Sequence, residues 1–203
     1  MMKLRYSPTS PFVRKVTVLC RETGLDKLVE RVPTNPWSAE DDLPSDNPLG
    51  KVPALVLDDG MTLFESLLIC EYLDSLHGGE RLVPPIGSAR WQVLRQHALA
   101  DGILDSAVLL LVEGKRRPED KRWADWSERQ KDKIDRALDS LEADIAEPEA
   151  AFTVGPMTVA IALDYLDFRF PDYGWRAGRP TLEAWHQAIS ARPSLQETLP
   201  QEP

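Results

Sequence analysis

Two hydroxyl residues stand at the first place where this chain could do chemistry. Thr9 and Ser10 precede Pro11 and follow a short strand-like run at residues 3–6. Serine is a preferred N-cap residue and proline a preferred first helical residue, so we expect a helix to begin here. The first N–H groups of a helix lack partners within it and favour an anion. A hydroxyl beside them can donate a hydrogen bond to a bound thiolate or oxyanion.

The same serine also has a purely structural interpretation. Most N-cap serines use their oxygen only to accept from the first turn of the helix. Ser7 is a more distant hydroxyl, and Tyr6 belongs to the preceding strand. The residues alone therefore leave open which hydroxyl, if any, meets a ligand.

The elements that must position this turn alternate between strand and helix. Hydrophobic spacing predicts strands at residues 4–6, 28–32, 54–57 and 62–64, helices at 12–22 and 66–76, and a loop at 33–48. The turn Asp58-Asp-Gly60 joins the last two strands as a hairpin. This order is that of a thioredoxin-like α/β domain, which we place at residues 1–78.

After a linker at residues 77–87, the pattern predicts helices alone. They cover residues 88–113, 127–145 and 157–166, and a fourth begins at Pro180. Ser127-Glu-Arg-Gln130 reads as a capping box, and Thr153 as the cap of the third helix. We expect an all-helical C-terminal domain at residues 86–203.

Composition excludes several classes of function. A net charge of -9 argues against nucleic acid as a partner. An anionic ligand would need a local basic patch, for which Arg5, Arg14, Lys15 and Lys51 are the early candidates. No stretch has the length of a membrane span, and the first residues carry no apolar signal core. Cys20 and Cys70 lack metal-ligand spacing, so we expect no metal and a cytoplasmic location.

Taken together, four segments resemble the bacterial glutathione transferases. They are Ser10-Pro-Phe-Val-Arg-Lys15, Asn47-Pro-Leu-Gly-Lys-Val-Pro53, Phe64-Glu-Ser-Leu-Leu-Ile-Cys-Glu-Tyr-Leu73 and Ala191-Arg-Pro-Ser-Leu195. All four occur in order and are followed by a helical half. The resemblance implies a glutathione-binding thioredoxin-like domain, glutathione as co-substrate, conjugation of its thiolate to a small electrophile in detoxification, and a homodimer.

The resemblance also implies a set of glutathione contacts. The Val52–Pro53 bond is cis in the family, which would let the Val52 backbone pair with the cysteinyl unit as an added strand does. Glu65 would accept from the γ-glutamyl ammonium, and Ser66 would donate to its carboxylate. Lys51 and Phe12 belong to the same implied set. A purely structural alternative for Glu65 is a role in a capping box that begins at Thr62.

The implied catalytic group is a hydroxyl that donates to the glutathione sulfur. In the thiol-transferring classes a cysteine stands at the position of Ser10, whereas theta- and delta-like classes place their serine at the position of Thr9. Both residues stay candidates. On the long helix, a stripe from Trp91 to Val112 contains Asp101 and Asp105, which repel each other at this spacing. The resemblance places Asp101 near the glutathione ammonium across a dimer.

Two other functions fit the same fold. One is a glutathione-dependent disulfide-bond oxidoreductase or peroxidase, and the other is a glutathione-binding protein without turnover. No motif in the helical half identifies a second substrate.

Overall fold

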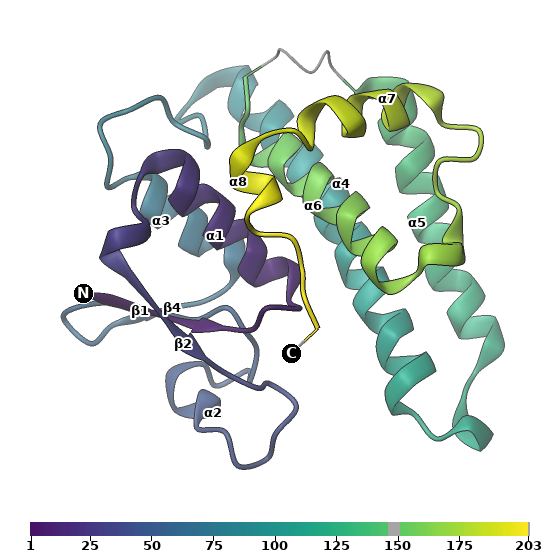
Figure 1. Cartoon of the computed structure of the whole chain (residues 1–203), viewed down its shortest axis with the longest axis horizontal. Coiled ribbons are helices and arrows are strands. Elements are labelled where there is room, and N and C mark those ends of the chain that lie inside the picture. Colours follow the sequence, from purple (N-terminus) through teal and green to yellow (C-terminus); the bar gives the residue numbers. More distant parts are fainter. Residues whose placement is uncertain (146–150, 203) are drawn as a thin grey trace. The chain divides into compact units, whose positions relative to one another are not determined.

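The computed structural model describes residues 1–145 and 151–202 (Figure 1). The chain divides into two compact units. The first combines Met1–Pro85 with the segment that begins at Pro193, and the second is Ile86–Arg192. Within the described residues, no helix has both the length and the apolar character needed to cross a membrane.

The first unit has the expected thioredoxin-like order. Its elements are β1 (Met2–Tyr6), α1 (Pro11–Thr23), the 3-10 turn η1 (Asp26–Leu28), β2 (Val29–Pro33), α2 (Leu43–Asp46), β3 (Leu55–Val56), β4 (Thr62–Leu63) and α3 (Ser66–Asp74). The sheet runs β2-β1-β3-β4. In it β1 is parallel to β2 and antiparallel to β3, and β3 is antiparallel to β4. Helices α1 and α3 lie side by side over the sheet (Figure 1).

Local sequence explains why α1 begins and ends where it does. Ser10 has extended backbone angles and caps the helix, and Pro11 occupies the first helical position. Gly24 ends the helix at a φ of 72°, a left-handed conformation that glycine adopts without steric cost. Between these ends, Val13 and Val16 are almost fully buried against the sheet and α3.

The last helix, α8 (Pro193–Gln196), contacts α1 and so belongs to the first unit. The guanidinium of Arg14, which is 5% exposed, donates to the Leu195 carbonyl at 3.0 Å and to the Thr198 hydroxyl at 3.3 Å. Arg21, farther along α1, pairs with Glu197, which directly follows α8. The expected helical domain at 86–203 differs from the structure here, because a buried arginine of α1 finds its acceptors in the final segment.

The second unit is helical throughout its described part, as expected. It contains α4 (Gly87–Leu111), a π-type turn η2 (Val112–Arg116), η3 (Glu119–Lys121), α5 (Ala124–Asp144), α6 (Val154–Arg169), η4 (Pro171–Tyr173) and α7 (Pro180–Ile189). Helix α4 packs against both α5 and α6. Helix α6 is buried on nearly every side, which explains its uniformly apolar sequence.

One local expectation for this unit is wrong. Helix α5 begins at Ala124, so Ser127 lies inside it and its hydroxyl donates to the Trp123 carbonyl at 3.3 Å. The expected position of Thr153 is confirmed, since it is the N-cap of α6, although its side chain makes no cap hydrogen bond. On α4 the buried face carries His97, Ala100, Ile103, Leu104, Ala107 and Leu110. The stripe from Trp91 to Val112 is the more exposed one, which fits the two carboxylates that interrupt it, and Trp91 and Asp105 are both exposed.

The close approach of α6 to α4 generates a stability prediction. A Cβ added at Gly155 would lie 2.6 Å from the Gln96 Oε1 and 3.0 Å from the Val93 carbonyl oxygen. Gln96 can move, but the Val93 backbone cannot do so without disturbing the helix. We therefore expect Gly155→Ala to destabilise the protein by about 1–3 kcal/mol in urea unfolding followed by circular dichroism.

Gly102→Ala on α4 is the matched control. A Cβ there meets nothing within 4 Å, so alanine should be neutral or stabilising by up to about 1 kcal/mol. Equal stability of the two variants would contradict the tight contact at Gly155.

Candidate functional site

The turn between β1 and α1 holds Ser10 in a capping position. The Ser10 Oγ accepts from the Val13 N–H at 3.3 Å, and the Ser10 N–H donates to the Ser7 carbonyl at 3.2 Å. The structural interpretation of this serine is therefore confirmed. A hydroxyl that accepts one bond keeps its own hydrogen for donation. Ser10 and Thr9 are both partly exposed, so either hydroxyl can reach a ligand.

The loop before β3 presents the backbone of Val52. The Val52–Pro53 peptide bond is cis, and Pro53 is buried. Among the described residues, neither the N–H nor the C=O of Val52 takes part in a backbone hydrogen bond. Both groups can therefore pair with an extended peptide, in the manner of an added strand.

Asn47 organises this loop, although sequence analysis gave it no individual role. Its side chain is 2% exposed, and its amide nitrogen donates to the Lys51 carbonyl at 2.7 Å. Its Oδ1 accepts from the Leu49 N–H at 3.0 Å. Both ends of one buried amide thus fix the chain immediately before Val52. An asparagine before proline in a loop was the available signal, since its side chain readily bonds to nearby backbone.

Glu65 is itself the N-cap of α3. Its Oε1 accepts from the N–H groups of Leu67 at 2.5 Å and of Leu68 at 3.0 Å. The alternative capping box is wrong, because Thr62 lies in β4 rather than at the start of the helix. Ser66, the first residue of α3, is 2% exposed, whereas Glu65 is exposed. The Phe64–Glu65 peptide bond is also cis.

Strand register brings these three features to one edge of the sheet. Leu4 of β1 faces Leu55 of β3, and the Arg5 N–H donates to the Ala54 carbonyl at 2.8 Å. Continuing this antiparallel register places Val52 beside the end of β1, from which the chain enters the Ser10 turn. Leu55 also faces Leu63 of β4, so Glu65 follows at the same edge. One edge therefore gathers two helix N-termini and the Val52 backbone.

The four basic residues near the start of the chain, Arg5, Arg14, Lys15 and Lys51, do not form an exposed basic patch. Arg5 pairs with Asp46 at 2.5 Å and with Asp42 at 2.7 Å. Arg14 and Lys15 are buried, and Lys51 alone of the four is exposed. Positive potential at this edge therefore comes largely from the helix N-termini, not from a cluster of surface cations.

Both cysteines lie in the core of the first unit. Cys20 and Cys70 are free and buried. Burial, with a smaller contribution from the nearby Asp26 carboxylate, raises the pKa of the Cys20 thiol to about 12. Burial likewise raises the pKa of the Cys70 thiol far above its usual range. Thiols that stay protonated and inaccessible are poor nucleophiles, so any thiolate chemistry here requires an external thiol.

The remaining implied residues occupy different surroundings. Phe12 is partly exposed on the first turn of α1, with the Lys15 ammonium 5.1 Å from its ring centre. Asp101 is partly exposed on α4 of the second unit, and its assignment stays a prediction. Among the described residues, no three His, Cys, Asp or Glu side chains are placed to hold a metal ion.

Comparison with known proteins agrees with this geometry. Residues 9–76 match the glutathione S-transferase N-terminal domain, and residues 124–188 match the C-terminal domain. The chain is 38% identical to the uncharacterized GST-like protein YibF of Escherichia coli (strain K12), over 98% of both chains. It is 32% identical to glutathione S-transferase 3 of Zea mays, over 98% of this chain and 93% of the relative.

Solved structures extend the similarity to the whole fold. A glutathione transferase family member from Pseudomonas fluorescens Pf-5, crystallised with bound glutathione, is 47% identical with a TM-score of 0.95 over 100% of both chains. A second structure from the same organism contains S-(propanoic acid)-glutathione and is 46% identical, with a TM-score of 0.90 over 98% of this chain and 100% of the other. With its two matched domains and relatives of near-equal length, this chain belongs to the glutathione S-transferase family.

Proposed function

We propose that this protein is a glutathione transferase that conjugates the glutathione thiolate to a small electrophile. The observation that carries the proposal is the single sheet edge that gathers the Val52 backbone and the N-termini of α1 and α3. Glutathione is an extended peptide with a thiol in its middle and an amino acid headgroup at one end. The bound glutathione and S-(propanoic acid)-glutathione of the Pseudomonas fluorescens structures support the same assignment.

Each part of glutathione has a proposed partner. The cysteinyl backbone pairs with the N–H and C=O of Val52, beside Pro53 and the exposed Lys51. The γ-glutamyl carboxylate accepts from Ser66 at the start of α3. The Glu65 carboxylate accepts from the ammonium with the capacity left after capping α3. The complete proposed set is Phe12, Lys51, Val52, Pro53, Glu65, Ser66 and, from a second subunit, Asp101.

The proposed chemistry needs no covalent bond to the protein. The N-terminus of α1 and the hydroxyl of Ser10 or Thr9 stabilise the thiolate and so lower the pKa of the glutathione thiol. The sulfur lone pair then forms the bond to the electrophilic carbon. The leaving group departs with its electron pair, and the thiol proton passes to solvent. The buried state of both cysteines agrees with a mechanism in which glutathione alone supplies the nucleophile.

Glu65 is predicted to have two separable roles. Glu65→Ala removes both the cap of α3 and the charge that meets the ammonium, so it should lower stability by about 1 kcal/mol as well as glutathione affinity. Glu65→Gln keeps an oxygen for the cap but loses the charge. It should retain stability and still weaken glutathione binding about tenfold or more in calorimetry, as expected for a lost hydrogen bond between charged groups.

Glu80→Gln is the control for a lost exposed carboxylate in the same unit. Unchanged glutathione affinity in Glu65→Gln would remove this residue from the proposed site.

Cysteine substitutions can identify the hydroxyl that faces the sulfur. A cysteine at a helix N-terminus has a lowered pKa and becomes a nucleophile. If Ser10 faces the sulfur, Ser10→Cys incubated with glutathione disulfide should form a mixed protein–glutathione disulfide and release one glutathione, as measured by intact mass. The variant should gain thiol-transferase activity and lose conjugating activity. Ser10→Ala should lower turnover only modestly, because the N–H groups of α1 remain.

Thr9→Cys is the matched variant, one residue away and not the N-cap. An adduct on Thr9→Cys but not on Ser10→Cys would assign the chemistry to Thr9 and leave Ser10 as a cap. Disulfide reductase assays on the unmodified protein, beside conjugation assays, separate transferase from oxidoreductase activity.

We also propose a homodimer in which the exposed face of α4 takes part. Trp91 is 69% exposed and Ile86 is 81% exposed, so the beginning of this helix presents apolar surface that a second copy can cover. Light scattering at micromolar concentration should give twice the monomer mass, and Trp91→Glu should weaken the dimer. Trp123→Glu, at another exposed tryptophan, should not do so; a monomeric mass for the unmodified protein would exclude the proposal.

A further inference from the structure

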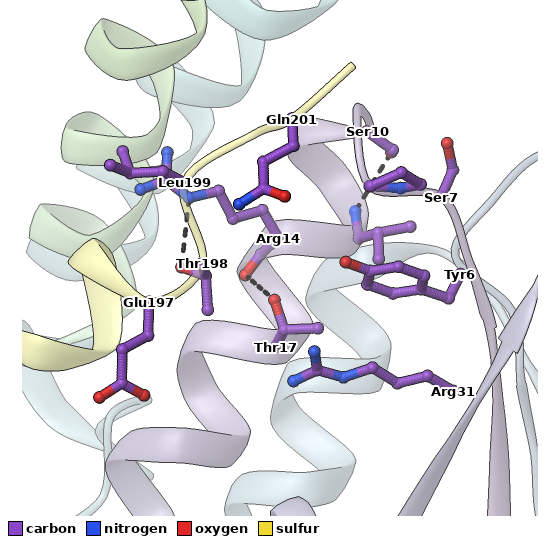
Figure 2. Close-up of a pocket in the computed structure, with 12 residues that line it drawn as sticks. Tyr6, Ser7, Ser10, Arg14, Thr17, Arg31, Glu197, Thr198, Leu199 and Gln201 are labelled. Atoms are coloured by element: carbon purple, nitrogen blue, oxygen red, sulfur yellow. Dashed lines mark hydrogen bonds between the residues drawn. The ribbon is translucent and has the colours of Figure 1, made fainter. Parts of the chain in front are cut away.

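A pocket of about 170 Å³ in the first unit adjoins the candidate catalytic turn (Figure 2). Its walls come from the end of β1, the first two turns of α1, β2 and the final segment of the chain. The lining residues that matter here are Tyr6, Ser10, Arg14, Thr17, Arg31 and Glu197. The sequence pattern identifies Tyr6 only as a strand residue, and no motif singles out Thr17, Arg31 or Glu197.

The pocket follows one face of α1. Ser10, Arg14 and Thr17 recur at the spacing of successive helical turns, so their side chains share one side of the helix. At a rise of 1.5 Å per residue, the distance along the helix from Ser10 to Thr17 is about 10 Å. A small molecule can therefore have one end beside Ser10 and the other beside Thr17.

The far end of the pocket holds two groups that can still donate a hydrogen bond to a ligand, the Tyr6 hydroxyl and the Arg31 guanidinium. The Arg31 guanidinium lies over the Tyr6 ring, 5.4 Å from its centre, and its ion pair with Asp26 is long at 3.5 Å. Among the described residues, neither the Arg31 guanidinium nor the Tyr6 hydroxyl forms a hydrogen bond. Figure 2 shows Tyr6 between Ser10 and Arg31, with its hydroxyl pointing toward α1. Arginine carries five N–H donors in a planar fork that matches a carboxylate.

The charge around the pocket also favours an anion. Arg14 is buried in the wall, and its bonds to Leu195 and Thr198 hold the guanidinium in place. Glu197 is the acidic residue among the described lining residues, and its carboxylate pairs with Arg21. Arg14 and Arg31 thus both line this pocket in a chain whose net charge is -9. Positive charge in such a space is stabilised by an anionic partner.

We propose that this pocket binds the carboxylate of an acidic electrophile, which makes anionic compounds the preferred second substrates. The inference rests on the proposed transferase function. The carboxylate accepts from Arg31 and Tyr6, while the reactive carbon lies at the Ser10 end, where the glutathione sulfur is proposed to be. An aryl halide that carries a ring carboxylate has this form. The thiolate forms a C–S bond at the halogenated carbon, chloride leaves with the bonding electrons, and the thiol proton goes to solvent.

The test compares a charged and a neutral electrophile of equal shape. The probes are 4-chloro-3-nitrobenzoate and 4-chloro-3-nitrobenzamide, and each kcat/KM with glutathione is divided by the uncatalysed rate constant. The normalised value should favour the carboxylate about tenfold. Arg31→Gln should lower this carboxylate-to-amide ratio about tenfold, Arg31→Lys should restore part of it, and Tyr6→Phe should lower it severalfold.

Lys27→Gln, which removes an exposed charge from the same unit, is the control and should leave the ratio unchanged. Equal normalised rates for the two probes, or an equal loss of both in Arg31→Gln, would overturn the inference.

A binding measurement separates failure of this inference from failure of the proposed function. If neither probe is conjugated although glutathione binds, the transferase proposal fails. Calorimetry of the unreactive 3-nitrobenzoate and 3-nitrobenzamide, with glutathione present, then decides on the pocket. Benzoate binding that weakens about tenfold in Arg31→Gln supports an anion site, and no preference for benzoate over benzamide overturns it.

Discussion

The first unit is built around the need to satisfy the N–H groups at the beginnings of two helices. Helices α1 and α3 both begin at the edge of the sheet where β1 and β4 end, and each leaves donors without intrahelical partners. The Ser10 side chain caps α1, and the Glu65 side chain caps α3. The side chains that complete the two helices are therefore the same ones that are proposed to face glutathione at this edge. On that proposal, stability and recognition use one set of atoms, so substitutions at these positions should affect both.

The helix N-termini explain how a chain with strong net negative charge could present the proposed site for an anionic peptide. The partial positive charge of a helix N-terminus comes from backbone groups and does not depend on composition. The cations nearest in sequence, Arg5, Arg14 and Lys15, are engaged or buried within the fold. Their positions show why counting charged residues near a motif is a poor guide to the local potential.

Much of the first unit could be predicted from the sequence because its signals are local. Ser10, Pro11 and Gly24 mark the two ends of α1 within a few residues of the helix itself. The succession of strands and helices along the chain followed from short apolar runs and one hairpin turn. The expected boundaries of α1 and α3 agree with the structure to within two residues.

The features that the sequence did not predict depend on contacts between residues that are distant in sequence. Nothing near Arg14 indicates that its acceptors are at residues 195 and 198, and nothing near Arg31 indicates that it contributes to a pocket with Tyr6. On α4 the apolar residues are numerous enough to form two stripes, and packing against α5 and α6 decides which one is buried. At the start of α3 the sequence suggested a capping box from Thr62, but Thr62 pairs in β4 and Glu65 caps the helix instead.

The hydrogen bonds of Arg14 to Leu195 and Thr198 have a consequence for biosynthesis. Residues 193–198 leave the ribosome after the whole of the second unit, yet they complete the packing of a helix near the beginning of the chain. The nascent first unit must therefore wait, with the Arg14 side chain still hydrated, until everything between has been translated. Contacts of such long sequence separation form late and slowly. During that interval the surface of α1 that the tail will cover is open to chaperones and to other nascent chains.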